Sequence, residues 1–149
     1  MGTRSLTRVI PRQEGLSFNE GHEKGELAHV NMYRQFDGYP GGHGLELAEF
    51  LKDFNIINGI GKDTKLGLHA NGSGCLAAQM IKHFKEEVGN IYLYPADDDR
   101  GWEEYIYTVY PKENEPVYIS IWSVFEERCI FVGTPSQLIK KYKSTTNNN

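Results

Sequence analysis

The stretch from Met32 to Gly44 constrains this chain more than any other, because the hydrophobic period changes within it. It reads MYRQFDGYPGGHG, so strand-like residues come first and a segment rich in glycine and proline follows. An amphipathic helix comes next, with Leu47, Leu51 and Phe54 on one face. The stretch therefore predicts a strand, a loop and a helix N-terminus in direct succession.

The rest of the chain predicts an α+β fold whose antiparallel sheet has about six strands. Strands are expected in segments that are aromatic, β-branched or alternating, namely 3–10, 27–36, 90–95, 105–110, 117–125 and 129–132. The first two form a hairpin across the polar connection 11–25. The last four form an antiparallel meander.

Two helices are expected between the second and third strands. One begins at His43, and the other begins at the glycine-rich segment Asn71–Gly74 and ends at Gly89. Between them, residues 55–70 are expected to form a long loop with one short strand or turn. The apolar face of the second helix is predicted to hold Ala77, Met80, Ile81, Phe84 and Val88.

A short third helix is predicted near the C-terminus. Thr134–Gln137 is a capping box with proline at the first helical position, and the helix is expected to run to about Tyr142. The 149 residues fit one α+β domain over 1–143. A disordered polar tail is expected over 144–149.

Composition and charge exclude several function classes. A formal net charge of −4 argues against a nucleic-acid binder that is held by phosphate contacts. The sequence has no long apolar run, so neither a membrane partner nor export is expected, and the protein is predicted to be cytoplasmic. Cys75 and Cys129 make no disulfide framework. The histidines have no metal-ligand spacing, so no metal or other cofactor is expected.

Two glycine-rich loops that lead into helices predict a ligand site. Helix N-termini present unpaired N–H groups, and glycine permits close approach to the backbone, so anions are the natural ligands. The sequence therefore predicts binding of a small phosphorylated, nucleotide-type ligand. The expected contacts are Arg34, Gln35, Asp37, Tyr39, Gly41, Gly42, His43 and Gly44 in the first loop, and Asn71, Ser73 and Gly74 in the second.

Two geometries are open for these loops. If the helices pack with their N-termini together, both loops face one pocket, which would suit a dinucleotide or a nucleoside diphosphate. Substituting Arg34 by Ala would then abolish binding and leave the fold intact. In the alternative interpretation, Arg34 pairs with Asp37 or with an acid of the next helix, the glycines only turn the chain, and Asn71 or Ser73 is only an N-cap.

Two other functions are weighed against this binding function. Cys75 lies in the first turn of the second helix, where the helix dipole favours a thiolate, so a cysteine-dependent hydrolase or transferase is one. Its base would be His43 or His69, oriented by Asp37. A small buried cysteine is the plainer alternative. The other function is inhibition of a host protein through an exposed sheet edge, and such an edge would also favour a homo-oligomer.

Several segments of the chain share their pattern with known sequences. These are MGTRSLT, MYRQFDGYPGGHGLELAEFL, NGSGCLAAQMIKHFK, NIYLYP and GTPSQLIKKY, which together span nearly the full length. They resemble a family of small proteins from bacteriophages and bacterial genomes that begin with MGTRSLT. The resemblance supplies no chemistry. A phage setting implies a counter-defence sponge that sequesters a nucleotide immune signal in the cytoplasm of the host bacterium.

Overall fold

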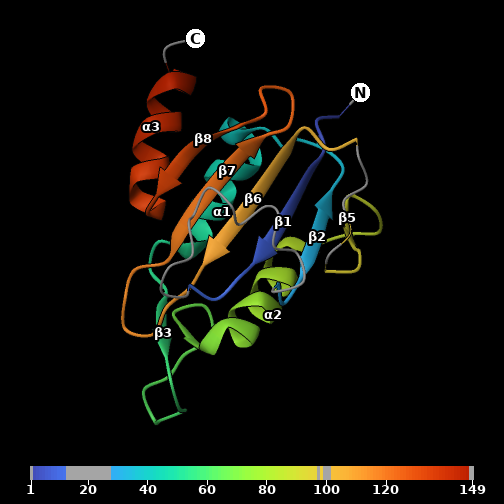
Figure 1. Ribbon diagram of the computed structural model, residues 1–149. Helices are drawn as coiled ribbons and strands as arrows, with labels where there is room; N and C mark the ends of the chain where they lie inside the picture. The colour runs from blue at the N-terminus through green and yellow to red at the C-terminus, as the bar shows by residue number, and fades with distance from the viewer. Residues whose placement is uncertain (1, 13–27, 97, 99–101, 148–149) are drawn as a thin grey trace.

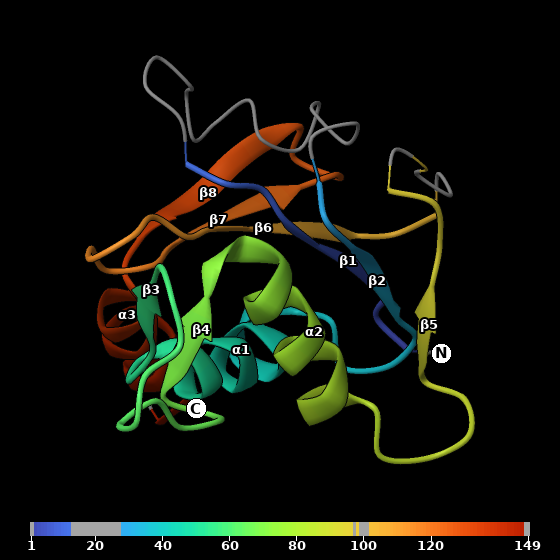
Figure 2. The same cartoon turned by 90° about the horizontal axis from the view of Figure 1, so that it is seen from below.

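The computed structural model describes residues 2–12, 28–96, 98 and 102–147, and the predicted connection 11–25 lies largely outside this part. The fold is α+β, as the sequence predicts, with a six-stranded, mostly antiparallel sheet (Figure 1). The three helices lie together on one face of this sheet (Figure 2). The sheet therefore forms one layer and the helices form a second layer against it.

The structure contains eight strands, three α-helices and a π-helical turn among its described residues. They are β1 (Ser5–Val9), β2 (Asn31–Arg34), a π-helical turn (Pro40–Gly44), α1 (Leu45–Leu51), β3 (Asn55–Ile57), β4 (His69–Asn71), α2 (Gly72–Phe84), β5 (Ile91–Leu93), β6 (Tyr105–Tyr110), β7 (Tyr118–Ser123), β8 (Arg128–Gly133) and α3 (Pro135–Asn147).

The strand order in the sheet is β5-β2-β1-β6-β7-β8. β1 and β2 pair antiparallel as predicted, and β6, β7 and β8 form the predicted meander. β5 corrects the prediction, because it pairs with β2 at the far edge and does not join the meander. A hydrophobic pattern shows which face of a strand is buried but does not name the neighbouring strand. β1 also pairs parallel with β6, with Leu6 opposite Ile106.

The core lies between the sheet and the helices. The inward residues alternate along the strands, as expected for a sheet with one face against a helical layer. Each fully buried Leu or Ile contributes about 1.5–3 kcal/mol of transfer free energy. The cluster includes Val9, Met32, Val109 and Ile119 from the sheet and Leu47, Leu51, Leu76, Met80 and Leu138 from the helices.

Two helix ends and one predicted loop differ from the sequence prediction. α2 ends at Phe84, and Val88, which was expected on its apolar face, is fully exposed. The predicted loop 55–70 contains two short strands, β3 and β4, which pair in parallel. α3 continues to Asn147, beyond the predicted end at about Tyr142.

The capping box of α3 is confirmed. The Gln137 side chain accepts a hydrogen bond from the Thr134 N–H at 2.8 Å, and the Thr134 hydroxyl accepts one from the Gln137 N–H at 3.3 Å. This reciprocal pair satisfies N–H groups that would otherwise lack a partner at the helix start. Local sequence alone therefore determines where this helix begins.

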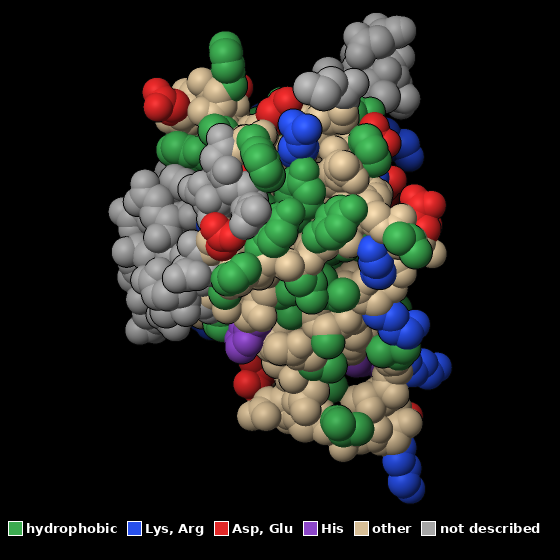
Figure 3. Space-filling view, turned by 90° about the vertical axis from the view of Figure 1, so that its right-hand side faces the viewer, with side chains coloured by type: hydrophobic (Ala, Val, Ile, Leu, Met, Phe, Trp, Pro, Cys, Tyr) green, Lys and Arg blue, Asp and Glu red, His purple; other side chains and the backbone are tan. Residues whose placement is uncertain are grey.

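Lysine side chains cover carbonyls at both edges of the large sheet. At the β5 edge, Lys85 Nζ donates to Gly89 O at 3.0 Å and to Ile91 O at 2.8 Å. At the β8 edge, Lys141 Nζ donates to Ile130 O at 3.1 Å. The side of the molecule that carries β5 still shows grouped hydrophobic side chains (Figure 3). A lysine that donates to an edge carbonyl occupies an acceptor that a strand of another chain would need, so these two contacts oppose strand pairing there. The homo-oligomer stays a prediction.

Candidate ligand site

The first glycine loop uses its backbone N–H groups within the fold. In the π-helical turn, the N–H groups of Gly42 and Gly44 donate to Tyr39 O at 2.9 and 3.5 Å. The His43 N–H donates to Asp37 O at 2.8 Å. These three groups were predicted to hold an anion, but they already have acceptors. The proline and the tight turn direct them inward, so this loop is no open anion cradle.

Two glycines of this loop are required by close packing. A Cβ at Gly38 would lie 2.8 Å from Ser5 Cβ, and a Cβ at Gly42 would lie 2.6 Å from Asp37 O. The Asp37 backbone has φ of 61°, which places it in the left-handed region. These glycines therefore shape the turn, as the alternative interpretation proposed. Among the other predicted contacts, the side chains of Asp37 and Tyr39 are exposed.

His43 is a fully buried, neutral histidine. Its Nδ1 lies 3.1 Å from Arg34 Nη1, and its Nε2 lies 2.7 Å from Thr7 Oγ1. Because arginine only donates, Nδ1 must accept, and the proton on Nε2 is donated to Thr7. Burial, reinforced by the charge of Arg34, lowers the His43 pKa to about 3. His43 is therefore a structural residue that neither meets a ligand nor acts as a base.

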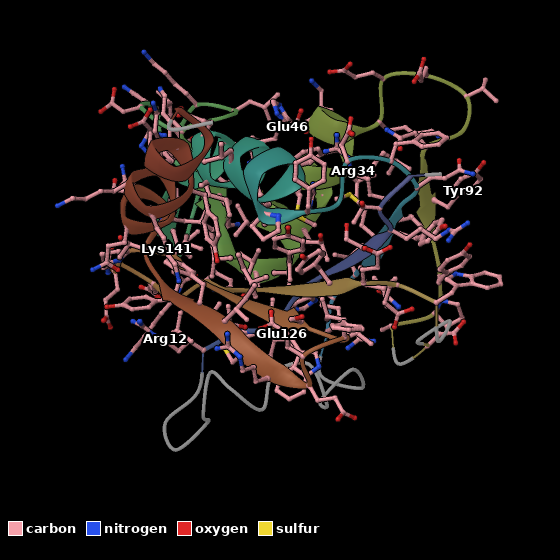
Figure 4. The ribbon with its side chains drawn as sticks, turned by 90° about the horizontal axis from the view of Figure 1, so that it is seen from above. Arg12, Arg34, Glu46, Tyr92, Glu126 and Lys141 are labelled. Atoms are coloured by element: carbon pink, nitrogen blue, oxygen red, sulfur yellow. The ribbon has the colours of Figure 1, made fainter. Side chains whose placement is uncertain are left out.

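Arg34 links the sheet to α1. Its Nε donates to Phe36 O at 2.6 Å, and its Nη1 forms an ion pair with Glu46. Figure 4 shows Arg34 and Glu46 side by side. Pairing with an acid of the following helix is confirmed, and Arg34 is only 7% exposed. Removing it would leave the Phe36 carbonyl and His43 without a donor, so Arg34→Ala is not a neutral change for the fold.

Arg34 also lines a cavity of about 490 Å³ between α1, the C-terminal end of α2 and the strands β2 and β5. Its volume lies within the range of small-molecule sites, roughly 300–1,000 Å³. Arg34 comes from the end of β2, while α1 and the end of α2 supply most of the other side chains. The lining residues are Arg34, Leu45, Glu46, Glu49, Phe50, His83, Phe84, Glu86, Asn90 and Ile91.

Aromatic rings form one side of this cavity. The rings of Phe50 and His83 are stacked with centroids 4.4 Å apart and an interplanar angle of 20°. Phe84 meets His83 edge-on, with centroids 5.0 Å apart. The geometry arises because Phe50 on α1 faces the last turn of α2. A planar ligand ring can extend such a stack.

The charges around the cavity are mainly negative. Glu46 is neutralised by Arg34, and Glu49 lies 2.8 Å from Lys52, whose hydrogen bond lowers the Glu49 pKa. Glu86 has no cationic partner among the residues that the structure describes. The cavity therefore complements hydrogen-bond donors more than it complements a phosphate dianion.

The second glycine loop lies elsewhere. Asn71–Gly74 is at the start of α2, while the cavity uses the other end, roughly 18 Å away by helix rise. The Asn71 side chain accepts the Gly59 N–H at 2.8 Å and does not cap the helix. Asn71 and Ser73 line a separate cavity of about 350 Å³ with Arg12, which Figure 4 shows across the molecule from Arg34. The two loops therefore share no pocket.

Cys75 does not meet its proposed partners. It lines a third cavity, of about 170 Å³, with His69 and Gln79, while His43 is buried beside Arg34. The Lys65 N–H donates to His69 Nδ1 at 3.0 Å. Neutral His69 therefore carries its proton on Nε2 and has no free lone pair to take a thiol proton. The partly buried Cys75 packs against the core, as the plainer alternative states.

No protein-family model, curated protein sequence or solved structure matches this chain. Within its described part, no helix is long and apolar enough to cross a membrane. The function is therefore argued from the cavity itself.

The sequence prediction included one side chain of this cavity, Arg34, and missed the rest. Glu46, Glu49 and Phe50 recur at the three- and four-residue spacing of one helix face, which was the available signal. The sequence prediction assigned none of these three residues to a site. His83 and Glu86 lie close to these residues of α1 only because α1 packs against the end of α2. The sequence holds no local sign of that contact.

Proposed function

We propose that this protein binds a small nucleotide-type ligand without converting it, and that the base of the ligand occupies the cavity between α1 and α2. The observation that carries the proposal is a cavity of about 490 Å³ in which Phe50 and His83 are stacked beside the buried Arg34. An aromatic surface next to a fixed hydrogen-bond donor is what a flat heterocycle requires.

Stacking supplies the main attraction in this proposal. A base that stacks on an aromatic side chain gains about 1–3 kcal/mol, as measured by alanine substitution. His83 is the ring to test, because it is exposed and lies in the last turn of α2, where alanine is well tolerated.

The charge distribution orients the ligand. Three glutamates line the cavity, and Glu46 already occupies Nη1 of Arg34. A phosphate there would face carboxylates and compete with Glu46 for the guanidinium. The base is therefore the end that enters, and phosphates extend toward solvent. This orientation replaces the sequence expectation that Arg34 holds the phosphate.

The position of Cys75 supports binding over catalysis, because His43 and Asp37 are not in its cavity and His69 lacks a free lone pair. The resemblance to small phage and bacterial proteins supports a biological role as a counter-defence sponge. In that role the protein would sequester a nucleotide signal in the cytoplasm of the host bacterium.

A thermal-shift screen tests the proposal, because a ligand that binds only the folded state raises the melting temperature. The panel contains nucleosides, nucleotides, cyclic dinucleotides and ADP-ribose. The test variant is His83→Ala, and the matched control is His29→Ala, which removes an exposed histidine outside the cavity. We expect a shift in wild type and in the control, and roughly a fivefold or greater loss of affinity in His83→Ala.

Recovery of the ligand separates sequestration from turnover. After heat denaturation of the complex, the bound compound should be recovered unmodified in stoichiometric amount. A converted product, lost on Cys75→Ser, would support the hydrolase or transferase instead. A melting temperature unmoved by the whole panel would refute the binding function.

A further inference from the structure

We infer that the cavity between α1 and α2 selects guanine among nucleobases, an inference that rests on the proposed function. Two polar groups on its wall carry the argument. Glu86 offers a carboxylate without a cationic partner among the described residues, and Arg34 offers a guanidinium that the fold holds in place.

Arg34 is a fixed donor. Its Nε and Nη1 have acceptors in Phe36, His43 and Glu46, and its side chain is more than nine-tenths buried. Nη2 makes no hydrogen bond to any described residue, yet Arg34 lines the cavity. A ligand that reaches Nη2 must supply an acceptor, and the O6 and N7 atoms of guanine are the acceptors that arginine contacts most often in nucleic acids.

Glu86 is an acceptor with two oxygens. An ionised carboxylate only accepts hydrogen bonds, so its best partner has two N–H donors side by side. Guanine alone among the standard bases has this pair, at N1 and at the 2-amino group. Adenine and cytosine would place a ring-nitrogen lone pair against the carboxylate, and uracil has a single N–H between two carbonyls.

The two contacts and the aromatic side select the base together. Guanine can extend the stack of Phe50 and His83, direct O6 or N7 to Arg34, and direct its two N–H donors to a carboxylate. Asn90 does not compete for the same donors, because its Oδ1 accepts the Phe36 N–H at 3.1 Å.

Isothermal titration calorimetry with guanosine, inosine and adenosine tests the inference on the full chain. Inosine lacks only the 2-amino group, so it removes one of the two donors. We expect guanosine to bind about tenfold more tightly than inosine or adenosine. Glu86→Gln should cost guanosine about tenfold. Glu87→Gln, which changes the adjacent exposed acid that does not line the cavity, should leave the preference intact.

The outcomes separate this inference from the proposed function. Equal affinity for guanosine and adenosine would overturn the base preference and leave nucleoside binding standing. A preference unchanged in Glu86→Gln would overturn the role of that carboxylate. No heat with any nucleoside, together with binding of methylammonium that Glu86→Gln abolishes, would overturn both and would identify the cavity as a site for cations.

Discussion

Lowering the pH from about 7 to about 5 should destabilise this protein through one residue, His43. In the folded state its pKa is about 3, against 6.5 for an unperturbed histidine. The unfolded chain therefore takes up the proton first as the pH falls. The contribution of His43 to stability is complete above about pH 6.5 and is lost progressively between pH 6.5 and pH 3.

The size of the effect follows from these two pKa values. Linkage gives a loss of about 0.7 kcal/mol from pH 7 to pH 6 and about 2 kcal/mol from pH 7 to pH 5. All three pH values lie above the ordinary pKa range of carboxyl groups, so most of the change in this window comes from histidine. The structural cause is a buried imidazole whose Nδ1 faces the Arg34 guanidinium and so cannot accept a proton.

Urea denaturation of wild type and of His43→Asn at the three pH values measures the effect. The Asn carbonyl can take the place of Nδ1 as acceptor for Arg34, so the variant lacks the titrating group but keeps one contact. We expect the free energy of unfolding of wild type to fall by about 2 kcal/mol more than that of the variant between pH 7 and pH 5.

An NMR titration of the wild-type histidines checks the same reasoning if the variant does not fold. The His43 ring should stay neutral, with its proton on Nε2, over the whole pH range in which the protein remains folded. Equal pH slopes in the two proteins, or a His43 ring that titrates near pH 6.5, would refute the assignment of this residue as buried and neutral.

Two further predictions concern other contacts. Tyr107→Phe removes the 2.7 Å hydrogen bond from the buried hydroxyl to Gly38 O. It should lower the free energy of unfolding by about 1–2 kcal/mol in urea denaturation. An unchanged urea midpoint would show that the bond does not hold the loop. Lys85→Met uncovers Ile91 O at the β5 edge and should increase self-association, measured by sedimentation velocity. A variant that associates no more than wild type would show that the lysine does not protect this edge.

Local patterns predicted where helices and strands lie along the chain better than they predicted which elements are neighbours in space. The aromatic and β-branched segments became β6, β7 and β8, and the capping box at Thr134 begins α3. The position of β5 was missed because a strand of three residues carries no information on which edge it joins. The early end of α2 was missed because Val88 has the helical spacing but has no surface to cover.

The candidate site was predicted less well, for a physical reason. Of the polar groups predicted around Arg34, the structure brings His43 into contact with it. A glycine-rich segment can either bind a ligand or turn the chain. That choice depends on whether its N–H groups point outward. Here the turn after Pro40 directs them to the carbonyls of Asp37 and Tyr39. The candidate site is instead the cavity between α1 and α2. That cavity depends on contact between the two helices, which no local sequence pattern encodes.

The position of β1 in the middle of the sheet has a consequence for how the chain folds during synthesis. β1 is complete once Val9 is made, but its parallel partner β6 begins only at Tyr105. A ribosome adds about 5–20 residues per second, so β1 waits roughly 5 to 20 seconds for this neighbour. During that time β2 pairs with one side of β1, while the other side exposes a row of unpaired peptide groups. The nascent chain is therefore most open to mispairing or to a chaperone just before its last third emerges.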